Sequence, residues 1–287
     1  MGNNETKTIG VFYTDKNRKT LVMEALMESI IEDGNDITSK YEKADIVITF
    51  GLSIFSDIHE RARKENKPNI LIDLGYWERN YEMLSKKNHY RLSVQHPQPS
   101  NYIMHMGEDP ERFLSYKKTI QPWKMSGDYI LLADIGQKSY DFFDMEYQSW
   151  AKKAIIEIQK HTDRPIIYRA KPSSFTAKGG LPGIPFSDPM QEPIEHALKN
   201  AYAAVTYHSN VGCDALLAGV PIFIQAGAAL HMGLQDLSKI ETPFYPTNRF
   251  SFFCNLAYCQ WNVNEMRQGL AWKHLKEKLI PLVYEKT

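Results

Sequence analysis

The polar residues best placed to bind a charged ligand lie in one segment, residues 205–224, Val-Thr-Tyr-His-Ser-Asn-Val-Gly-Cys-Asp-Ala-Leu-Leu-Ala-Gly-Val-Pro-Ile-Phe-Ile. Its pattern predicts a strand, a polar turn, a short helix and a second strand. Ser209 or Asn210 can cap that helix, and Gly212 keeps its first turn open to close approach. Free N–H groups and the positive dipole end at the start of a helix attract phosphate. Asp214 stands a few residues inside, where its carboxylate can hold two ribose hydroxyls.

Other predicted loops carry groups that suit a diphosphate. Arg169 and Lys171 directly follow an apolar run, and arginine can grip a diphosphate with two hydrogen bonds where lysine acts as a point charge. Gly136 and Gln137 follow the strand expected at residues 129–133. Solvated loop cations, an ordinary turn and a structural histidine are the competing interpretations. The residues predicted to bind the ligand are Gly136, Gln137, Arg169, Lys171, His208, Ser209, Asn210, Gly212, Asp214 and Gln225.

One carboxylate in the first half of the chain is placed to act as a general base. Asp73 ends the apolar run Asn-Ile-Leu-Ile-Asp-Leu and is followed by Gly75. A carboxylate at the carboxyl end of a buried strand stays partly desolvated, which raises its pKa toward that of a useful base. Asp73 is therefore the predicted catalytic residue. Glu78 and Asp15 are alternatives, and so is a structural Asp73 that pins its loop.

Basic residues gather in two places in the same half, at residues 16–19 and at residues 86–91. Cations that contact phosphates and aromatic rings that contact unstacked bases are what a nucleic-acid partner requires. An ordinary solvated face with scattered aromatic residues is the alternative. The aromatic residues interleaved with the second cluster are Tyr76, Trp77, Tyr81 and Tyr90. The residues predicted to bind an acceptor molecule are Lys16, Arg18, Lys19, Tyr76, Trp77 and Arg79.

Composition limits the class of protein. Lys plus Arg and Asp plus Glu are equal at 34 each, so no global field draws the chain to DNA or membranes, and any basic patch must be local. Cys213, Cys254 and Cys259 form no metal-binding motif and suit buried thiols in a reducing compartment. The N-terminus has no apolar signal region and no run is long enough to span a bilayer, so a cytoplasmic location without membrane contact is expected.

Strand-length apolar runs alternate with amphipathic segments of helix length, which is typical of a parallel sheet flanked by helices. One series has strands near residues 9–13, 45–50 and 69–74, and a second begins at residues 129–133. We therefore expect an α/β protein with two Rossmann-like domains facing each other across a cleft, with ligands at the carboxyl ends of the strands. The expected parts are an N-terminal domain at residues 1–126, a second domain at 127–250, and helices at 251–287 that cross back.

Two motifs resemble a known family. Arg169-Ala-Lys-Pro and the His-Ser-Asn-Val-Gly-Cys-Asp-Ala-Leu-Leu-Ala-Gly-Val-Pro stretch from His208 resemble the donor half of GT-B glycosyltransferases, above all the group related to capsular polysaccharide synthesis enzymes. Residues 70–76 and 259–275 resemble segments of bacteriophage-encoded glycosyltransferase-like proteins, some of which glycosylate hydroxymethylated pyrimidines in viral DNA. The chain departs from the pattern at Lys171, where histidine is common, and at Asp214, where glutamate is usual.

The resemblance implies metal-independent transfer of a hexose from a nucleotide sugar, with UDP as the nucleotide, to a hydroxyl. In that reading Ser209, Asn210 and Gly212 bind the diphosphate, Asp214 holds ribose and Asp73 is the base or an acceptor ligand. The nucleotide sugar is a co-substrate, and no further cofactor or metal is expected. The expected acceptor is a 5-hydroxymethylpyrimidine in phage DNA, in the host cytoplasm. The alternatives are a glycosyltransferase acting on cell-surface glycans, a nucleotide-sugar epimerase, and a non-catalytic module that binds nucleotides or DNA.

Overall fold

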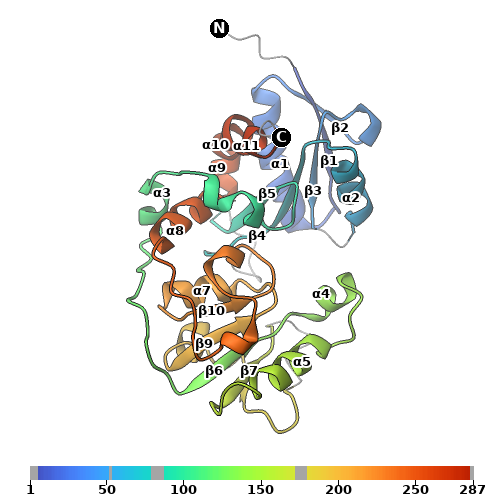
Figure 1. The fold of residues 1–287 in the computed structure, drawn as a ribbon. Helices are drawn as coiled ribbons and strands as arrows, with labels where there is room; N and C mark the ends of the chain where they lie inside the picture. Colours follow the sequence, from blue (N-terminus) through green and yellow to red (C-terminus); the bar gives the residue numbers. More distant parts are fainter. Residues whose placement is uncertain (1–5, 52–53, 79–86, 172–179, 285–287) are drawn as a thin grey trace. The chain divides into compact units, whose positions relative to one another are not determined.

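The computed structural model describes residues 6–51, 54–78, 87–171 and 180–284 (Figure 1). The chain forms two compact units. The first unit comprises Met1–Asp109 and Asn255–Thr287, and the second comprises Pro110–Cys254. The chain therefore passes from one unit to the other twice, after Asp109 and after Cys254.

The first unit is built on a six-stranded sheet with the strand order β11-β5-β4-β3-β1-β2. The strands β1 to β4 pair in parallel, as predicted. The strand β5 is antiparallel to both β4 and β11. The strands are β1 (Thr8–Phe12), β2 (Asp36–Thr38), β3 (Ile46–Phe50), β4 (Asn69–Leu74), β5 (His89–Val94) and β11 (Gln260–Asn262).

The C-terminal helices belong to the first unit, where they pack against α1 (Figure 1). Asp33, at the end of α1, accepts hydrogen bonds from Trp272 Nε1 at 2.8 Å and from Lys276 Nζ at 2.7 Å. On α2, Ala62 packs against Val47 of β3. The helices of this unit are α1 (Asn17–Glu32), α2 (Ser56–Lys64), α9 (Val263–Arg267), α10 (Leu270–His274), a π-helical turn (Leu275–Leu279) and α11 (Ile280–Tyr284).

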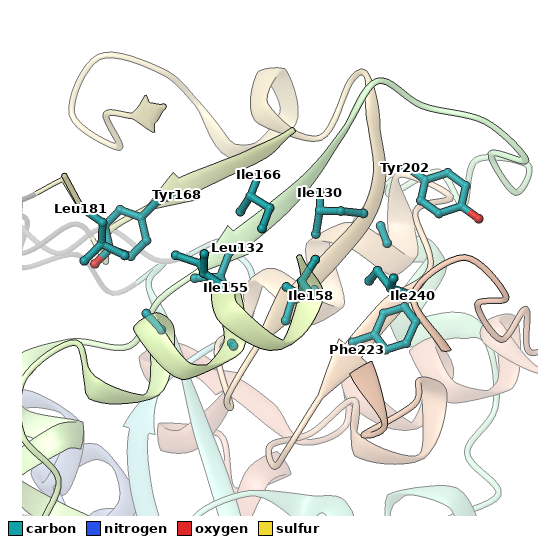
Figure 2. Packing of buried hydrophobic residues seen from close by; sticks show 14 of the residues in the cluster. Ile130, Leu132, Ile155, Ile158, Ile166, Tyr168, Leu181, Tyr202, Phe223 and Ile240 are labelled. Atoms are coloured by element: carbon teal, nitrogen blue, oxygen red, sulfur yellow. The ribbon is translucent and has the colours of Figure 1, made fainter. Parts of the chain in front are cut away.

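The second unit has a parallel five-stranded sheet in the order β10-β9-β6-β7-β8. Apolar side chains of the sheet and of α5 make its core, and Figure 2 shows Ile155 and Ile158 of α5 against Ile130 and Leu132 of β6. The strands are β6 (Tyr129–Ala133), β7 (Ile166–Arg169), β8 (Phe186–Ser187), β9 (Ala201–Thr206) and β10 (Ile222–Ile224). The helices are α3 (Glu111–Ser115), α4 (Gln137–Phe142), α5 (Ser149–Ile158), α6 (Ile194–Ala197) and α7 (Val211–Leu217), and α8 (Arg249–Ala257) runs across the division after Cys254.

Residues 110–126, which the sequence assigns to the first domain, are bonded to the second unit. The Gln121 N–H donates to Leu217 O at 2.8 Å, and the Lys124 N–H donates to Gly219 O at 2.8 Å. Gly219 has a φ of +73°, and a Cβ there would collide with the carbonyl oxygen of Pro122. Glycine therefore ends α7 and lets this connecting segment lie directly against the backbone.

Candidate functional site

Four loops meet at the carboxyl edge of the second sheet. Neighbouring strands β10, β9, β6 and β7 are parallel, so the segments that follow them emerge at the same edge. These segments contain the residues that the sequence predicts for ligand binding. The structure thus brings the predicted donor loops to one edge of one unit.

The loops after β6 and β7 touch through Gly136 and Lys171. A Cβ on Gly136 would lie 3.1 Å from Lys171 Cδ, so the aliphatic stem of the lysine lies against the turn that opens α4. Gln137 is exposed, and its Nε2 donates to Asp141 Oδ1 at 2.7 Å within the same helix. The glycine turn and a cation from the neighbouring strand end therefore share one place, as a phosphate site requires.

The loop after β9 leads into α7 through half-buried polar residues. Ser209 Oγ accepts the Val211 N–H at 3.3 Å, and the Ser209 N–H donates to Thr206 Oγ1 at 3.3 Å. The N-cap residue of α7 is Asn210, whose side chain makes no capping hydrogen bond. His208, Asn210 and Asp214 are also half-buried.

Gly212 has a different role from the predicted one. It is buried, and a Cβ there would lie 3.2 Å from Ile224 Cδ1 and 3.6 Å from the Ala229 Cβ. The close approach that this glycine permits is therefore that of α7 to β10 and the following loop. The side of Gly212 on which a Cβ would stand is filled by apolar side chains and is not open to a ligand.

The loops after β9 and β10 are fastened together by backbone contacts. The N–H groups of Gln225 and Ala226 donate to Tyr207 O at 3.0 and 2.7 Å. Gly227 has a φ of +99°, and a Cβ there would lie 3.0 Å from His208 O. The side chain of Gln225 donates to Gln235 O at 2.9 Å. Gln225 thus lies at the predicted edge, and its amide group anchors the next loop.

Arg169 is buried and is not open to a ligand. Its side chain is only 7% exposed, and it donates to Ser187 Oγ and to Glu192 O at 2.6 Å each. Burial lowers the pKa of this guanidinium, and the carboxylates of Glu192 and Asp188 oppose the change. The expectation that Arg169 projects openly toward a diphosphate is wrong, since these contacts commit the side chain to holding β7 against β8 and residues 187–192.

A buried carboxylate that the sequence reasoning missed underlies the same edge. Asp134, directly after β6, is 2% exposed and accepts hydrogen bonds from Tyr140 Oη at 2.6 Å, Tyr168 Oη at 2.7 Å and its neighbour Ile135 N–H at 2.8 Å. Burial raises the pKa of Asp134, and these hydrogen bonds offset part of that rise. The network fixes the segment that carries Gly136. Its sequence signal is an aspartate at the end of an apolar strand.

Asp73, the predicted base, lies in the first unit in a different environment from the expected one. Its side chain is 50% exposed, and its Oδ2 accepts Arg91 Nη2 at 3.1 Å. The Leu74 N–H donates to Oδ1 at 2.8 Å. The carboxylate is thus half shielded from solvent, and the antiparallel strand β5 places the buried Arg91 opposite it, a partner that the sequence pattern does not predict. Of the alternatives, Asp15 accepts the Thr20 hydroxyl at 2.9 Å.

The aromatic residues predicted to contact an acceptor are buried. Tyr76 and Trp77 both donate their N–H groups to Gln260 Oε1, at 2.6 and 3.1 Å, and Tyr90 is also in the core. These rings therefore cannot stack on an unpaired base, and this part of the prediction is wrong. Their backbone is held by Gln260 of β11, a strand that joins the sheet from far along the chain. Arg79, Tyr81 and Lys86 lie outside the described residues.

The other predicted acceptor residues open α1. Lys16 is the N-cap residue, and Arg18 and Lys19 lie in the first turn, which contains no Asp or Glu. Lys19 Nζ donates to Phe50 O at 3.2 Å, at the end of β3. Cations are unfavourable next to the positive end of a helix dipole, so this arrangement favours binding of an anion nearby.

Three further properties bear on the chemistry. Within the described ranges, no group of three or more His, Cys, Asp or Glu side chains is arranged to hold a metal ion. Of the helices in the described part of the chain, none combines the length and apolarity that crossing a membrane requires. Cys213, Cys254 and Cys259 are buried thiols.

Comparison with known proteins identifies the fold. No protein-family model matches the sequence, and no curated protein matches it significantly. In structure the chain is similar to the β-Kdo 2,4 transferase KpsC of Thermosulfurimonas dismutans, with a TM-score of 0.56, 14% identity and coverage of 92% of this chain and 99% of that one. It is less similar to the β-Kdo 2,7 transferase KpsC of that organism, with a TM-score of 0.49, 13% identity and coverage of 93% and 99%. For the Methanocaldococcus jannaschii UDP-GlcNAc 2-epimerase bound to UDP-GlcNAc and UDP, the TM-score is 0.30, with 13% identity and coverage of 76% and 83%.

At 14% identity, the likeness to the 2,4 transferase is one of fold. The chain has the mixed α/β fold of GT-B-like proteins, with two Rossmann-like sheets. The predicted fold class is therefore confirmed.

Proposed function

We propose that the protein is a glycosyltransferase that binds a nucleotide sugar at the carboxyl edge of its second sheet. The observation that carries the proposal is the meeting of Gly136, Lys171, His208 and Ser209 on adjacent loops of that edge. The fold shared with a Kdo transferase at a TM-score of 0.56 supports it. Sites of α/β sheets form at this edge, where loops of several strands converge.

The chemistry of the proposed transfer needs a stabilised leaving group and a base. Lys171, together with N–H groups near Gly136 at the start of α4, would stabilise the charge that develops on the departing diphosphate. Asp214 would hold the ribose, and UDP-hexose is the proposed donor. Asp73 is the proposed general base on the acceptor side, where its half-exposed carboxylate is open to a hydroxyl and its pairing with Arg91 orients it.

The proposed acceptor is the one that the sequence suggests, a 5-hydroxymethylpyrimidine in phage DNA. Lys16, Arg18 and Lys19 support it, because cations at the start of a helix suit a phosphate backbone. Burial of Tyr76 and Trp77 counts against it. A cell-surface glycan is the competing acceptor, and the transfer assay described next separates the two acceptors.

The decisive experiment offers the protein a panel of UDP-, CMP- and GDP-sugars together with hydroxymethylated DNA or oligosaccharides, and measures the mass of the products. We expect transfer from at least one donor. Lys171→Ala should weaken nucleotide binding, whereas Lys153→Ala, an exposed lysine on α5, should not. A wild-type protein that binds none of these donors would contradict the proposal, and transfer to oligosaccharides alone would exclude the DNA acceptor.

A further inference from the structure

An aromatic cluster lies on the loops that follow β6 and β9. Phe142 and Phe143 come at the end of α4, and Tyr207 and His208 come directly after β9. The Phe143 ring centroid lies 5.2 Å from that of Tyr207 and 5.7 Å from that of His208, and 5.1 Å from that of Phe142. We call these four residues the aromatic platform.

Two rings of the platform are exposed to solvent, and a third ring packs against α5. Phe142 is 48% exposed and Phe143 is 39% exposed. Trp150 of α5 meets the Tyr207 ring at 5.7 Å in an edge-on contact. Single exposed apolar residues are ordinary on a protein surface, whereas adjacent exposed rings in mutual contact offer a flat apolar surface on which another ring can pack.

The position of the platform indicates what that molecule is. His208 belongs to the platform and immediately precedes Ser209, whose hydroxyl accepts the N–H of Val211, the first residue of α7. Phe142 ends α4, and the turn that begins α4 contains Gly136, against which Lys171 lies. The platform is therefore continuous with the polar groups proposed to hold phosphate. A ligand that combines a flat aromatic ring with a phosphate would contact both the aromatic platform and the neighbouring polar groups.

We propose that the aromatic platform stacks the heterocyclic base of the donor nucleotide, with Phe143 as the central ring. This inference rests on the proposed function and adds the subsite for the base. Stacking between a base and an aromatic side chain is worth about 1–3 kcal/mol and accepts any base, since every base has a π-face. Selectivity among bases then has to come from polar groups around the platform.

The experiment compares binding of UMP, CMP, AMP, GMP and inorganic pyrophosphate to wild-type protein and to Phe143→Ala, by calorimetry. The variant should lose about 5- to 150-fold in nucleotide affinity, which is the stacking energy converted at 1.36 kcal/mol per tenfold. Its affinity for pyrophosphate should not change. Phe244→Ala is the matched control, because Phe244 is 44% exposed and its neighbour Tyr245 packs on Trp123, away from the platform.

Two more variants separate stacking from a folding defect. Phe143→Leu keeps apolar volume without a ring and should show the same selective loss, and Phe143→Trp should bind nucleotides at least as well as wild type. Unchanged nucleotide binding by the Ala and Leu variants would overturn the platform and leave the proposed function standing. Wild-type protein that binds no nucleotide would overturn both. Phe143-dependent binding of a single-stranded oligonucleotide, without binding of mononucleotides, would assign the platform to nucleic acid and overturn the inference.

Discussion

The same three-residue pattern closes an apolar parallel strand in each unit, and the two copies have opposite environments. Asp73-Leu-Gly covers the last two residues of β4 and the residue after it in the first unit, and Asp134-Ile-Gly directly follows β6 in the second. In both, the carboxylate accepts the N–H of the next residue at 2.8 Å. Asp73 is half-exposed beside Arg91, whereas Asp134 is buried beneath two tyrosine hydroxyls.

The difference shows that the backbone turn and the environment of its carboxylate, meaning its exposure and hydrogen-bond partners, have separate causes. The turn follows from the residues of the pattern itself. The environment of the carboxylate depends on which element packs next to the turn. The antiparallel strand β5 supplies a guanidinium to Asp73, whereas β7 and α4 supply tyrosine hydroxyls to Asp134. We therefore expect Asp73 to serve reactions at the surface of its unit and Asp134 to hold the donor edge in place.

The largest expected effect is on turnover. Asp73→Asn should lower the rate of transfer by about 10²- to 10⁴-fold, because it removes the proposed base, and should leave nucleotide affinity unchanged. Asp134→Asn should instead cost about 1–3 kcal/mol of unfolding free energy, because a buried charged acceptor of two hydroxyls is lost. Steady-state kinetics and calorimetry on both variants test the contrast. Near wild-type turnover in Asp73→Asn would remove Asp73 from the chemistry.

A smaller effect should separate the glycines of the two patterns. A Cβ on Gly75 would lie 2.8 Å from His89 O, which is backbone and cannot move aside, so Gly75→Ala should destabilise the first unit by about 1–3 kcal/mol. Gly136→Ala meets only the flexible stem of Lys171 and should change stability by less than about 0.5 kcal/mol. It should still weaken nucleotide binding, because it displaces that lysine.

Hydrogen exchange of the β4 and β6 amides reports the stability of each unit separately. Equal loss of protection in the two glycine variants would show that the close approaches at Gly75 and Gly136 are equivalent.

The smallest effect is a pH dependence of opposite sign for the buried carboxylates of the two units. Burial raises the pKa of Asp134 above 3.8, so its contribution to stability is largest at low pH and falls as the pH rises through the folded pKa. For Glu108, burial acts in the same direction, but hydrogen bonds from His274 and Lys278 outweigh it and lower the pKa below 4.5. Its contribution is present at neutral pH and falls as the pH drops through the folded pKa.

Unfolding of wild type, Asp134→Asn and Glu108→Gln between pH 7 and pH 4 measures this contrast. The advantage of wild type over Asp134→Asn should grow as the pH falls, and its advantage over Glu108→Gln should shrink. A tenfold change in proton affinity corresponds to about 1.4 kcal/mol, which sets the scale. Parallel pH profiles for the two variants would contradict the assignment of opposite environments.

The sequence predicts what local pattern controls. The apolar runs predict the parallel strands, and the residues after β6, β7, β9 and β10 meet at one edge because parallel order alone brings them there. The local hydrogen bond from the Val211 N–H to the Ser209 hydroxyl follows from residue type in the same way. These features depend on neighbours in the chain or on a general rule of sheet topology.

The features that the sequence does not predict come from distant pairings. Arg169 is buried where Ser187 and Glu192 fold back onto it, and the backbone N–H groups of the buried Tyr76 and Trp77 donate to Gln260, which comes from far along the chain. Nothing in the local pattern distinguishes Asp73 from Asp134, since the partners that decide their burial come from other elements. The polarity of a loop residue is thus readable from sequence, while its accessibility is not.

The return of residues 255–284 to the first unit has a consequence for synthesis. During translation β5 has a partner only on the β4 side, and its other edge stays unpaired until β11 emerges. An unpaired strand edge invites pairing with another chain. The second unit, in contrast, is complete once Cys254 has left the ribosome. Of the two units, the one whose synthesis begins earlier is therefore the one that finishes folding later, and during that interval its open edge is exposed to chaperones and to other nascent chains.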